Sequence, residues 1–341
     1  MALLTVSGLG KRFNLEAGFF ARYGRYVQAV NGLDFSIGKN ESYGIVGESG
    51  CGKTTTARLL VRMYEPDAGS IIFNASGSDP IDVCSLKKNE LKKYREKVKY
   101  IFQDPARSLN PRMSVYDILT SGRRWSTIKT GEKQNREDAG AILEEVGLSA
   151  QDLERRPSEF SGGQRQRISI ARALLMKPEL LICDEVVSAL DVSIQGQILN
   201  LLLDIRSKRG LSFLFIAHDL KVACYFCDRI GVMYRGELME EAASEILWKS
   251  AVHPYTELLF SSAAESVTIK KSVELPNKKN AAPPVMPAAA NNDGCAFAGR
   301  CSHAVGRCFT EKPQLENIAP GHRIRCFLTQ DELARDKRMG D

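Results

Sequence analysis

The stretch whose residue types and spacing most clearly indicate a chemical role is Gly47-Glu48-Ser49-Gly50-Cys51-Gly52-Lys53-Thr54-Thr55. They fit G-x-x-x-x-G-K-[ST], a loop whose backbone amides cradle phosphates. Its glycines let the chain turn N–H groups inward, and the helix predicted to follow favours negative charge at its start. Lys53 is predicted to reach the β- and γ-phosphates of a nucleotide, and the Thr54 hydroxyl to bind Mg²⁺. An ordinary glycine-rich turn is the alternative, disfavoured because glycines, Lys and Thr are all in register.

Polar residues also follow three predicted apolar strands. Leu180–Cys183 leads into Asp184 and Glu185, Ile101-Phe102 into Gln103, and Leu211–Ala217 into His218. Ligands bind at the carboxyl edge of parallel sheets, so we expect these side chains to share one edge. Asp184 suits Mg²⁺, Glu185 suits activation of an attacking water, and Gln103 suits contact with both. The alternatives are solvent-facing acids at a strand-to-turn boundary, a surface glutamine and a structural histidine.

A second helix start has features of an anion site. Ser161-Gly162-Gly163-Gln164 precedes an apolar helical stripe, so a serine cap and free amides are predicted there. Two such starts suggest one triphosphate held from two sides; the alternative is a simple helix cap. Among the aromatics of residues 13–26 we favour Tyr23 to stack on adenine, with packing of a loop onto the sheet as the alternative.

Four cysteines near the C-terminus, Cys295, Cys301, Cys308 and Cys326, have the spacing C-x5-C-x6-C-x17-C. Thiolates suit a soft metal centre. The spacing differs from the tight pairs of common zinc modules, and four unrelated reduced cysteines are the alternative. The other five cysteines are scattered, and the odd total of nine fits reduced thiols rather than a disulfide framework.

These residues need strands and helices to position them. Short apolar runs predict strands, and longer patterns with charged faces predict helices. An antiparallel β-layer is expected over residues 3–46, and a β-hairpin over residues 229–237. Further strands are predicted at 43–46, 70–73, 98–102, 180–184 and 211–217, and helices at 54–60, 86–96, 115–147, 162–174 and 194–206.

Composition sets the outer limits. The chain has 341 residues, 43% of them hydrophobic, which allows roughly two domains. Its net charge of +6 is too small to argue for a nucleic-acid partner. The apolar runs are too short to span a bilayer, and residues 1–8 do not resemble a signal peptide, so a soluble cytosolic protein is expected. We predict a main domain at 1–260, a partly disordered linker at 261–293 and a cysteine-rich region at 294–341.

The motifs of residues 3–260 resemble those of the ATP-binding subunits of ABC transporters. The matches are Walker A at Gly47–Thr55, the Q-loop at Gln103, the signature at Ser161–Gln164, Walker B at Leu180–Asp184, the catalytic glutamate at Glu185, the D-loop at Ser188–Asp191 and the switch histidine at His218. The family usually has Pro-Thr where this chain has Val186-Val187. The resemblance implies an α/β P-loop NTPase fold of the ABC type. An antiparallel β-subdomain, a mixed core sheet and a helical subdomain at roughly 105–175 would make up the cassette, followed by the cysteine-rich extension.

A narrower resemblance involves Phe13–Val30, His253-Pro254-Tyr255, the cysteine cluster and Ala319-Pro320-Gly321-His322. These resemble the oligopeptide/dipeptide (peptide/nickel) importer subfamily, and the N-terminal stretch resembles its F-type subunits. Some members carry a [4Fe–4S] centre, which the resemblance implies at the four C-terminal cysteines. Zinc, or no metal at all, remains the alternative.

The resemblance implies an ATPase motor that uses ATP and Mg²⁺. Its expected partners are a second, D-type ABC subunit in a head-to-tail heterodimer, two transmembrane permease subunits and an extracytoplasmic substrate-binding protein. The expected place is the cytoplasmic face of a prokaryotic cell membrane. Import of nickel or another solute is one alternative, a catalytically weaker member of an unlike pair is another, and a soluble ABC ATPase acting on nucleic acid or ribosomes is a third.

Overall fold

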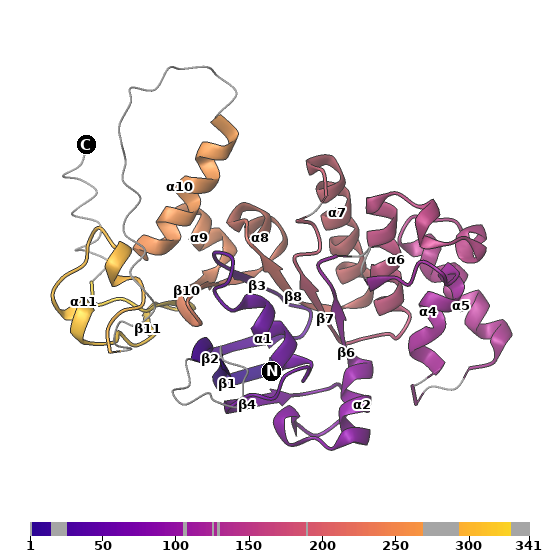
Figure 1. The fold of residues 1–341 in the computed structure, drawn as a ribbon, viewed down its shortest axis with the longest axis horizontal. Coiled ribbons are helices and arrows are strands. Elements are labelled where there is room, and N and C mark those ends of the chain that lie inside the picture. The colour runs from indigo at the N-terminus through magenta and orange to yellow at the C-terminus, as the bar shows by residue number, and fades with distance from the viewer. Residues whose placement is uncertain are drawn as a thin grey trace.

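The computed structural model describes residues 2–14, 26–104, 108–124, 126–127, 130–188, 190–268 and 293–328. Two sheets form its centre (Figure 1). The smaller is antiparallel, in the order β2-β1-β4-β5. Its strands are β1 (Ala2–Asn14), β2 (Tyr26–Gly38), β4 (Ala68–Phe73) and β5 (Ile81–Asp82). Strands β1 and β2 are the antiparallel layer predicted within residues 3–46, and β4 and β5 extend it.

The larger sheet has the order β11-β12-β10-β9-β3-β8-β7-β6. Its central strands are parallel and wholly buried, which explains their continuous apolar runs. The outer strands β10, β12 and β11 pair antiparallel, so the sheet is mixed, as predicted. The strands are β3 (Ser42–Val46), β6 (Val98–Ile101), β7 (Leu180–Asp184), β8 (Ser212–Ala217), β9 (Arg229–Tyr234), β10 (Glu237–Ala243), β11 (Glu316–Ala319) and β12 (His322–Ile324).

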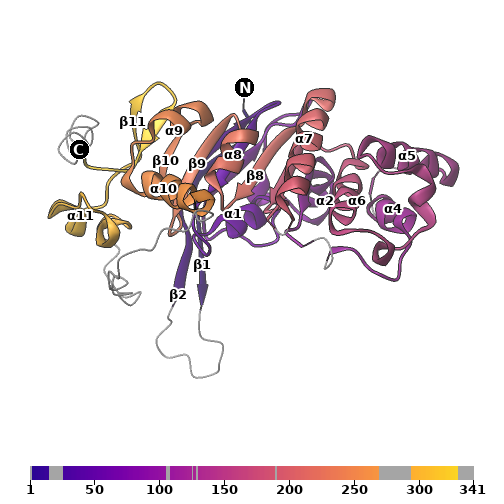
Figure 2. The same ribbon diagram turned by 90° about the horizontal axis from the view of Figure 1, so that it is seen from above.

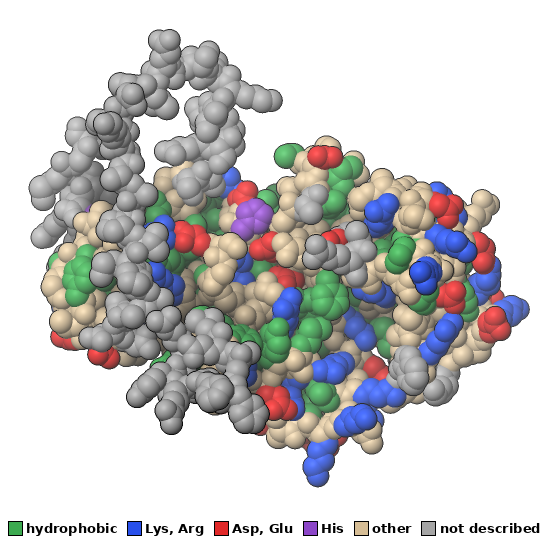
Figure 3. All heavy atoms as spheres, viewed as in Figure 1, with side chains coloured by type: hydrophobic (Ala, Val, Ile, Leu, Met, Phe, Trp, Pro, Cys, Tyr) green, Lys and Arg blue, Asp and Glu red, His purple; other side chains and the backbone are tan. Residues whose placement is uncertain are grey.

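Helices pack around and beside this sheet. Helices α4, α5 and α6 pack on one another at the end of the molecule opposite β11, within the residues predicted as a helical subdomain (Figures 1 and 2). The helices are α1 (Lys53–Leu60), α2 (Lys88–Lys97), α4 (Val115–Arg124), α5 (Glu132–Glu145), α6 (Gly162–Leu174), α7 (Val192–Arg209), α8 (Leu220–Phe226), α9 (Ser244–Ser250), α10 (Pro254–Thr268) and α11 (Arg307–Thr310). Acidic and basic side chains are interspersed over this end (Figure 3). Among the described residues, none of the helices combines the length and apolarity that crossing a membrane requires.

One predicted boundary is corrected. The linker was expected to begin at residue 261, but α10 continues to Thr268. The Ala-Ala-Glu run at 263–265 has high helix propensity, so the helix continues past residue 261, where the linker was placed from composition alone. The remaining residues of the predicted linker, 269–292, lie outside the described part of the chain.

The C-terminal region is built onto the core sheet through three buried glutamates of β10. Glu237 forms an ion pair with Lys312 Nζ at 2.5 Å, and Glu240 lies 2.8 Å from His322 Nε2. Glu241 accepts from Arg323 Nε at 2.6 Å and also from Arg229 and the Tyr43 hydroxyl. Buried carboxylates are tolerated only when paired in this way. The side chains of Lys312, His322 and Arg323 therefore attach the segment that contains β11 and β12 to β10.

This attachment gives a stability prediction. His322 and Glu240 are 3% and 0% exposed, so His322→Ala should remove the side-chain partner of a buried carboxylate and leave it only the backbone N–H groups of Val252 and His253. We expect the free energy of unfolding in urea to fall by about 3 kcal/mol. Arg124→Gln, which removes an exposed pair with Asp117, is the matched control and should change it by less than about 1 kcal/mol. Equal effects of the two substitutions would contradict the assigned role of the buried pair.

Candidate functional site

The glycine-rich loop joins β3 to α1 and is clamped between two other strands. A Cβ on Gly47 would lie 2.1 Å from the carbonyl oxygen of Met233 in β9. A Cβ on Gly52 would lie 2.1 Å from the carbonyl oxygen of Ala29 in β2, and Gly52 has φ +109°. Only glycine fits at either position. The loop therefore has a fixed path, with α1 beginning directly after it.

The charged and hydroxyl groups of the loop occupy definite positions. Lys53 is buried, and its Nζ donates to the carbonyl oxygens of Gly47 at 2.7 Å and Glu48 at 3.0 Å. The Thr54 hydroxyl donates to Asp184 Oδ1 at 3.1 Å. The structure thus brings together the lysine, the threonine and the carboxylate that were predicted from separate parts of the sequence.

Asp184 has a further partner that the sequence did not reveal. Tyr100, on the neighbouring strand β6, donates its hydroxyl to Asp184 Oδ2. Burial raises the pKa of Asp184 above its ordinary value and the nearby Glu185 carboxylate adds to this, while the bonds from Tyr100 and Thr54 oppose it. A buried carboxylate of this kind gains from a divalent cation, which would offset its desolvation. The sequence indicates only that Tyr100 lies in a predicted strand, 98–102, and not that this strand pairs with the one that ends in Asp184.

Glu185 leaves β7 in an uncommon conformation, with φ +50°. Its N–H donates to Ile216 of β8 at 3.0 Å, so the turn starts directly at the sheet edge. Gln103 Nε2 donates to Glu185 Oε2 at 2.7 Å, and His218 Nδ1 lies 3.3 Å from the Ser188 hydroxyl. The predicted shared edge of Asp184, Glu185, Gln103 and His218 is therefore present.

The second predicted phosphate site stands apart from the loop. Ser161 caps α6: its hydroxyl accepts from the Gln164 N–H at 3.3 Å, while Gln164 Oε1 accepts from the Ser161 N–H at 2.9 Å. Ser161, Gly162 and Gln164 are exposed, and α6 lies beside the other helices rather than over α1 (Figures 1 and 2). Asp191, before α7, is also exposed and makes no capping bond.

Two other expectations have different outcomes. Tyr23, proposed to stack on adenine, lies outside the described residues. Val186 and Val187, which stand where the family that the motifs resemble usually has Pro-Thr, are buried in the core. The Ser188 N–H donates to the Glu185 carbonyl at 3.1 Å and so closes the turn after Glu185.

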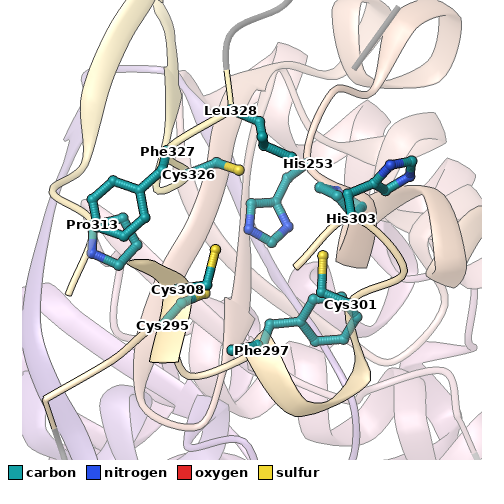
Figure 4. Close-up of a pocket in the computed structure, with 12 residues that line it drawn as sticks. His253, Cys295, Phe297, Cys301, His303, Cys308, Pro313, Cys326, Phe327 and Leu328 are labelled. Atoms are coloured by element: carbon teal, nitrogen blue, oxygen red, sulfur yellow. The ribbon is translucent and has the colours of Figure 1, made fainter. Parts of the chain in front are cut away.

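The four C-terminal cysteines line one pocket, together with His253 and Phe297 (Figure 4). Burial raises the pKa of the Cys295 and Cys301 thiols, and raises that of Cys326 to about 11. Within the described ranges, no three His, Cys, Asp or Glu side chains are gathered closely enough to hold one metal ion. A single zinc ion needs its cysteine ligands within about 2.3 Å of one point, and the described side chains are not gathered in that way.

A family model described as "ABC transporter" matches residues 30–188. A second, "Oligopeptide/dipeptide transporter, C-terminal region", matches residues 239–308, which include the first three cysteines of the cluster.

Several relatives match over nearly the whole chain. A probable peptide ABC transporter ATP-binding protein of Sinorhizobium fredii is 41% identical, over 96% of this chain and 90% of its own length. The oligopeptide transport ATP-binding protein AppF of Bacillus subtilis is 40% identical, over 96% of this chain and 97% of its own.

Solved structures agree in fold. The dimeric ATP-binding cassette MJ0796, bound to ADP and Pi, is 25% identical, with a TM-score of 0.61 over 71% of this chain and 98% of its own. The cbiO1 protein of Clostridium perfringens, part of an ABC transporter complex, is 25% identical with a TM-score of 0.62, covering 78% of this chain and 99% of its own.

The clamped loop gives a direct prediction. Gly52→Ala should force the loop away from Ala29, so the dissociation constant for MgATP should rise by more than about tenfold. The matched control is Gly77→Ala, which also has a positive φ, +72°, but has nothing within 4 Å of the new Cβ. It should leave the constant unchanged in an equilibrium titration. Normal MgATP affinity in Gly52→Ala would refute the clamped-loop description.

Proposed function

This chain belongs to the ABC transporter family, and from that membership we propose that it is the ATP-hydrolysing motor subunit of an importer for di- and oligopeptides. The observation that carries the proposal is the convergence of Lys53, Thr54, Asp184 and Glu185 at the end of β3 and β7. These side chains are of the types that phosphoryl transfer to water requires. The peptide specificity is inferred from the relatives and from the match to the oligopeptide/dipeptide C-terminal region.

The residues of the loop have distinct proposed roles. The amides of the loop from Gly47 to Thr55, including those of Ser49, Gly50 and Cys51, form the cradle, whereas the Glu48 amide already donates to Tyr255. Lys53 moves from the loop carbonyls to the β- and γ-phosphates. Bound Mg²⁺ supplies positive charge at the phosphate oxygens that carry developing negative charge. Thr54 and Asp184 already share a hydrogen bond and would hold that ion, with Gln103 completing its surroundings.

The hydrolytic step is assigned to the edge beyond β7 and β8. Glu185 accepts or orients the proton of the attacking water, and its present bond to Gln103 must open for that water to enter. His218 is positioned beside Ser188, from where it would reach the γ-phosphate side of the site. Tyr100 holds the second oxygen of Asp184 and so keeps that carboxylate oriented.

We infer a head-to-tail pairing with a second ABC subunit. Ser161, Gly162, Gly163 and Gln164 form a capped and largely exposed start of α6, and α6 lies beside the other helices rather than over α1 (Figures 1 and 2). In the pair, this start and Asp191 would close the partner's ATP site. A D-type heterodimer partner, two permease subunits and an extracytoplasmic binding protein complete the proposed assembly. It places the chain on the cytoplasmic face of a prokaryotic cell membrane.

For the C-terminal pocket we propose a [4Fe–4S] cluster. Four thiols are the donor set that such clusters use, and all four line the same pocket. Cys295, Cys301, Cys308 and Cys326 would bind iron as thiolates. Burial raises the thiol pKa of Cys295, Cys301 and Cys326 and so opposes their loss of a proton until iron is present. A structural role is proposed for the cluster, which would stabilise the described residues that lead into β11, 293–315.

The catalytic assignment predicts the behaviour of Glu185→Gln in the assembled transporter. Steady-state ATP hydrolysis should fall by roughly 10²- to 10⁴-fold because general-base assistance is lost. MgATP should remain bound and be recovered uncleaved. Glu245→Gln, an exposed acid in the first turn of α9, is the control and should hydrolyse ATP at the parental rate. Rapid turnover by Glu185→Gln would remove the residue from its assigned role.

The cluster assignment predicts the metal content of anaerobically purified protein. The parental protein should contain iron and absorb visible light, and Cys301→Ser should lose most of both. Cys84→Ser, a partly buried cysteine outside the pocket, should keep them. A well-folded parental protein that is colourless and free of iron would eliminate the cluster.

A further inference from the structure

The cysteine-rich region touches the phosphate-binding loop directly. Arg300 lies beside Cys301, and its Nη1 and Nη2 donate to Glu48 Oε2 and Oε1, each at 2.8 Å. Glu48 is the second residue of the loop, 252 positions away in sequence. A two-pronged guanidinium–carboxylate contact fixes orientation as well as distance. The cysteine-rich region therefore contacts the loop through the Glu48 side chain.

A second contact holds the backbone of the same loop residue. The N–H of Glu48 donates to the Tyr255 hydroxyl at 3.0 Å, and Tyr255 is fully buried in the first turn of α10. Glu48 is thus fixed through both its amide and its carboxylate. Because that amide is already bonded, it is not free to donate to a phosphate while the contact with Tyr255 holds.

Aromatic rings connect these contacts to the cysteine pocket. The Tyr255 ring packs on Tyr234 at 4.7 Å and on Phe297 at 5.2 Å between centroids. The Arg300 guanidinium lies 5.7 Å from the ring centres of both Tyr234 and Phe297. Phe297 itself lines the cysteine pocket (Figure 4). A continuous packed path therefore runs from the pocket wall to the loop.

The charges give this path a consequence for nucleotide binding. An unpaired Glu48 would add a negative charge to a loop that must accept a triphosphate. Bonding to Glu48 raises the pKa of Arg300 still further, so its charge is permanent. The Arg300 and Glu48 side chains are 37% and 41% exposed, so their ion pair contributes less to folding stability than a buried pair would. Its effect is therefore expected on the position and charge of the loop rather than on folding.

We propose that Arg300 is a positioning residue for ATP binding: through Glu48 it fixes and neutralises the phosphate loop, and so couples the cysteine-rich region to the nucleotide site. Coupling between two sites is reciprocal, so bound nucleotide must in turn order the segment around Arg300. This inference relies on the proposed ATPase function because nucleotide affinity is its readout.

The test uses the full-length chain and a non-hydrolysable MgATP analogue. Arg300→Gln should raise the analogue's dissociation constant about fivefold. Arg300→Lys should recover part of the loss because charge returns without the two-pronged contact. The matched control is Arg307→Gln, which removes an exposed pair with Glu311 in the same region and should bind the analogue as the parental chain does.

Two further measurements separate positioning from general damage. In a Glu48→Gln background, adding Arg300→Gln should cause no additional loss, because both substitutions remove the same interaction. Nucleotide should slow amide hydrogen exchange at residues 298–301 in the parental chain and in Arg307→Gln. Nucleotide should not slow exchange at these residues in Arg300→Gln or in Glu48→Gln. The second variant keeps the Arg300 side chain and its packing, so it tests the Arg300–Glu48 contact alone.

The outcomes are distinct. Parental affinity in Arg300→Gln, or equal losses in the parental and Glu48→Gln backgrounds, would overturn the coupling while leaving the ATPase proposal intact. Retained nucleotide protection at residues 298–301 in Glu48→Gln would also overturn it. A parental chain that binds no analogue would overturn both proposals.

Discussion

Close backbone packing at the phosphate loop is the constraint on which the rest of this structure depends. Gly47 and Gly52 lie so near the carbonyl oxygens of Met233 and Ala29 that no side chain could be accommodated. These contacts come from the two sheets, so the loop is fixed only when β2 and β9 are both in place. The start of α1 then directs Lys53 and Thr54 toward the end of β7. The chemistry at Asp184 and Glu185 is therefore a product of how the sheets meet.

The C-terminal region extends this constraint. Its strands join the core sheet through Glu237, Glu240 and Glu241, and the same region reaches the loop through Arg300. Because the buried carboxylates and the loop contact lie along β9, β10 and their neighbours, attachment of the region and position of the loop are linked. The cassette and the C-terminal region thus pack as one unit in the described part of the chain.

Much of the site followed from the sequence because it depends on local patterns. The loop, the capped start at Ser161 and the polar residues after apolar strands are all read from neighbouring residues. What the sequence missed depends on tertiary register. Tyr100 meets Asp184 only because β6 pairs with β7, and three acids in β10 are buried where a polar pattern suggests solvent. Arg300 and Glu48 meet across 252 positions, a pairing that no local rule predicts.

The central claim is that one triphosphate lies between the loop of this chain and the serine-glycine turn of a facing subunit. A structure of the assembled transporter with MgATP trapped before hydrolysis tests it most directly. The account predicts the γ-phosphate in contact with Lys53 and the loop amides on one side. On the other side it predicts the helix start of the facing subunit, with this chain's own Ser161 at the second nucleotide. A γ-phosphate remote from every such turn, or from Lys53, would contradict it.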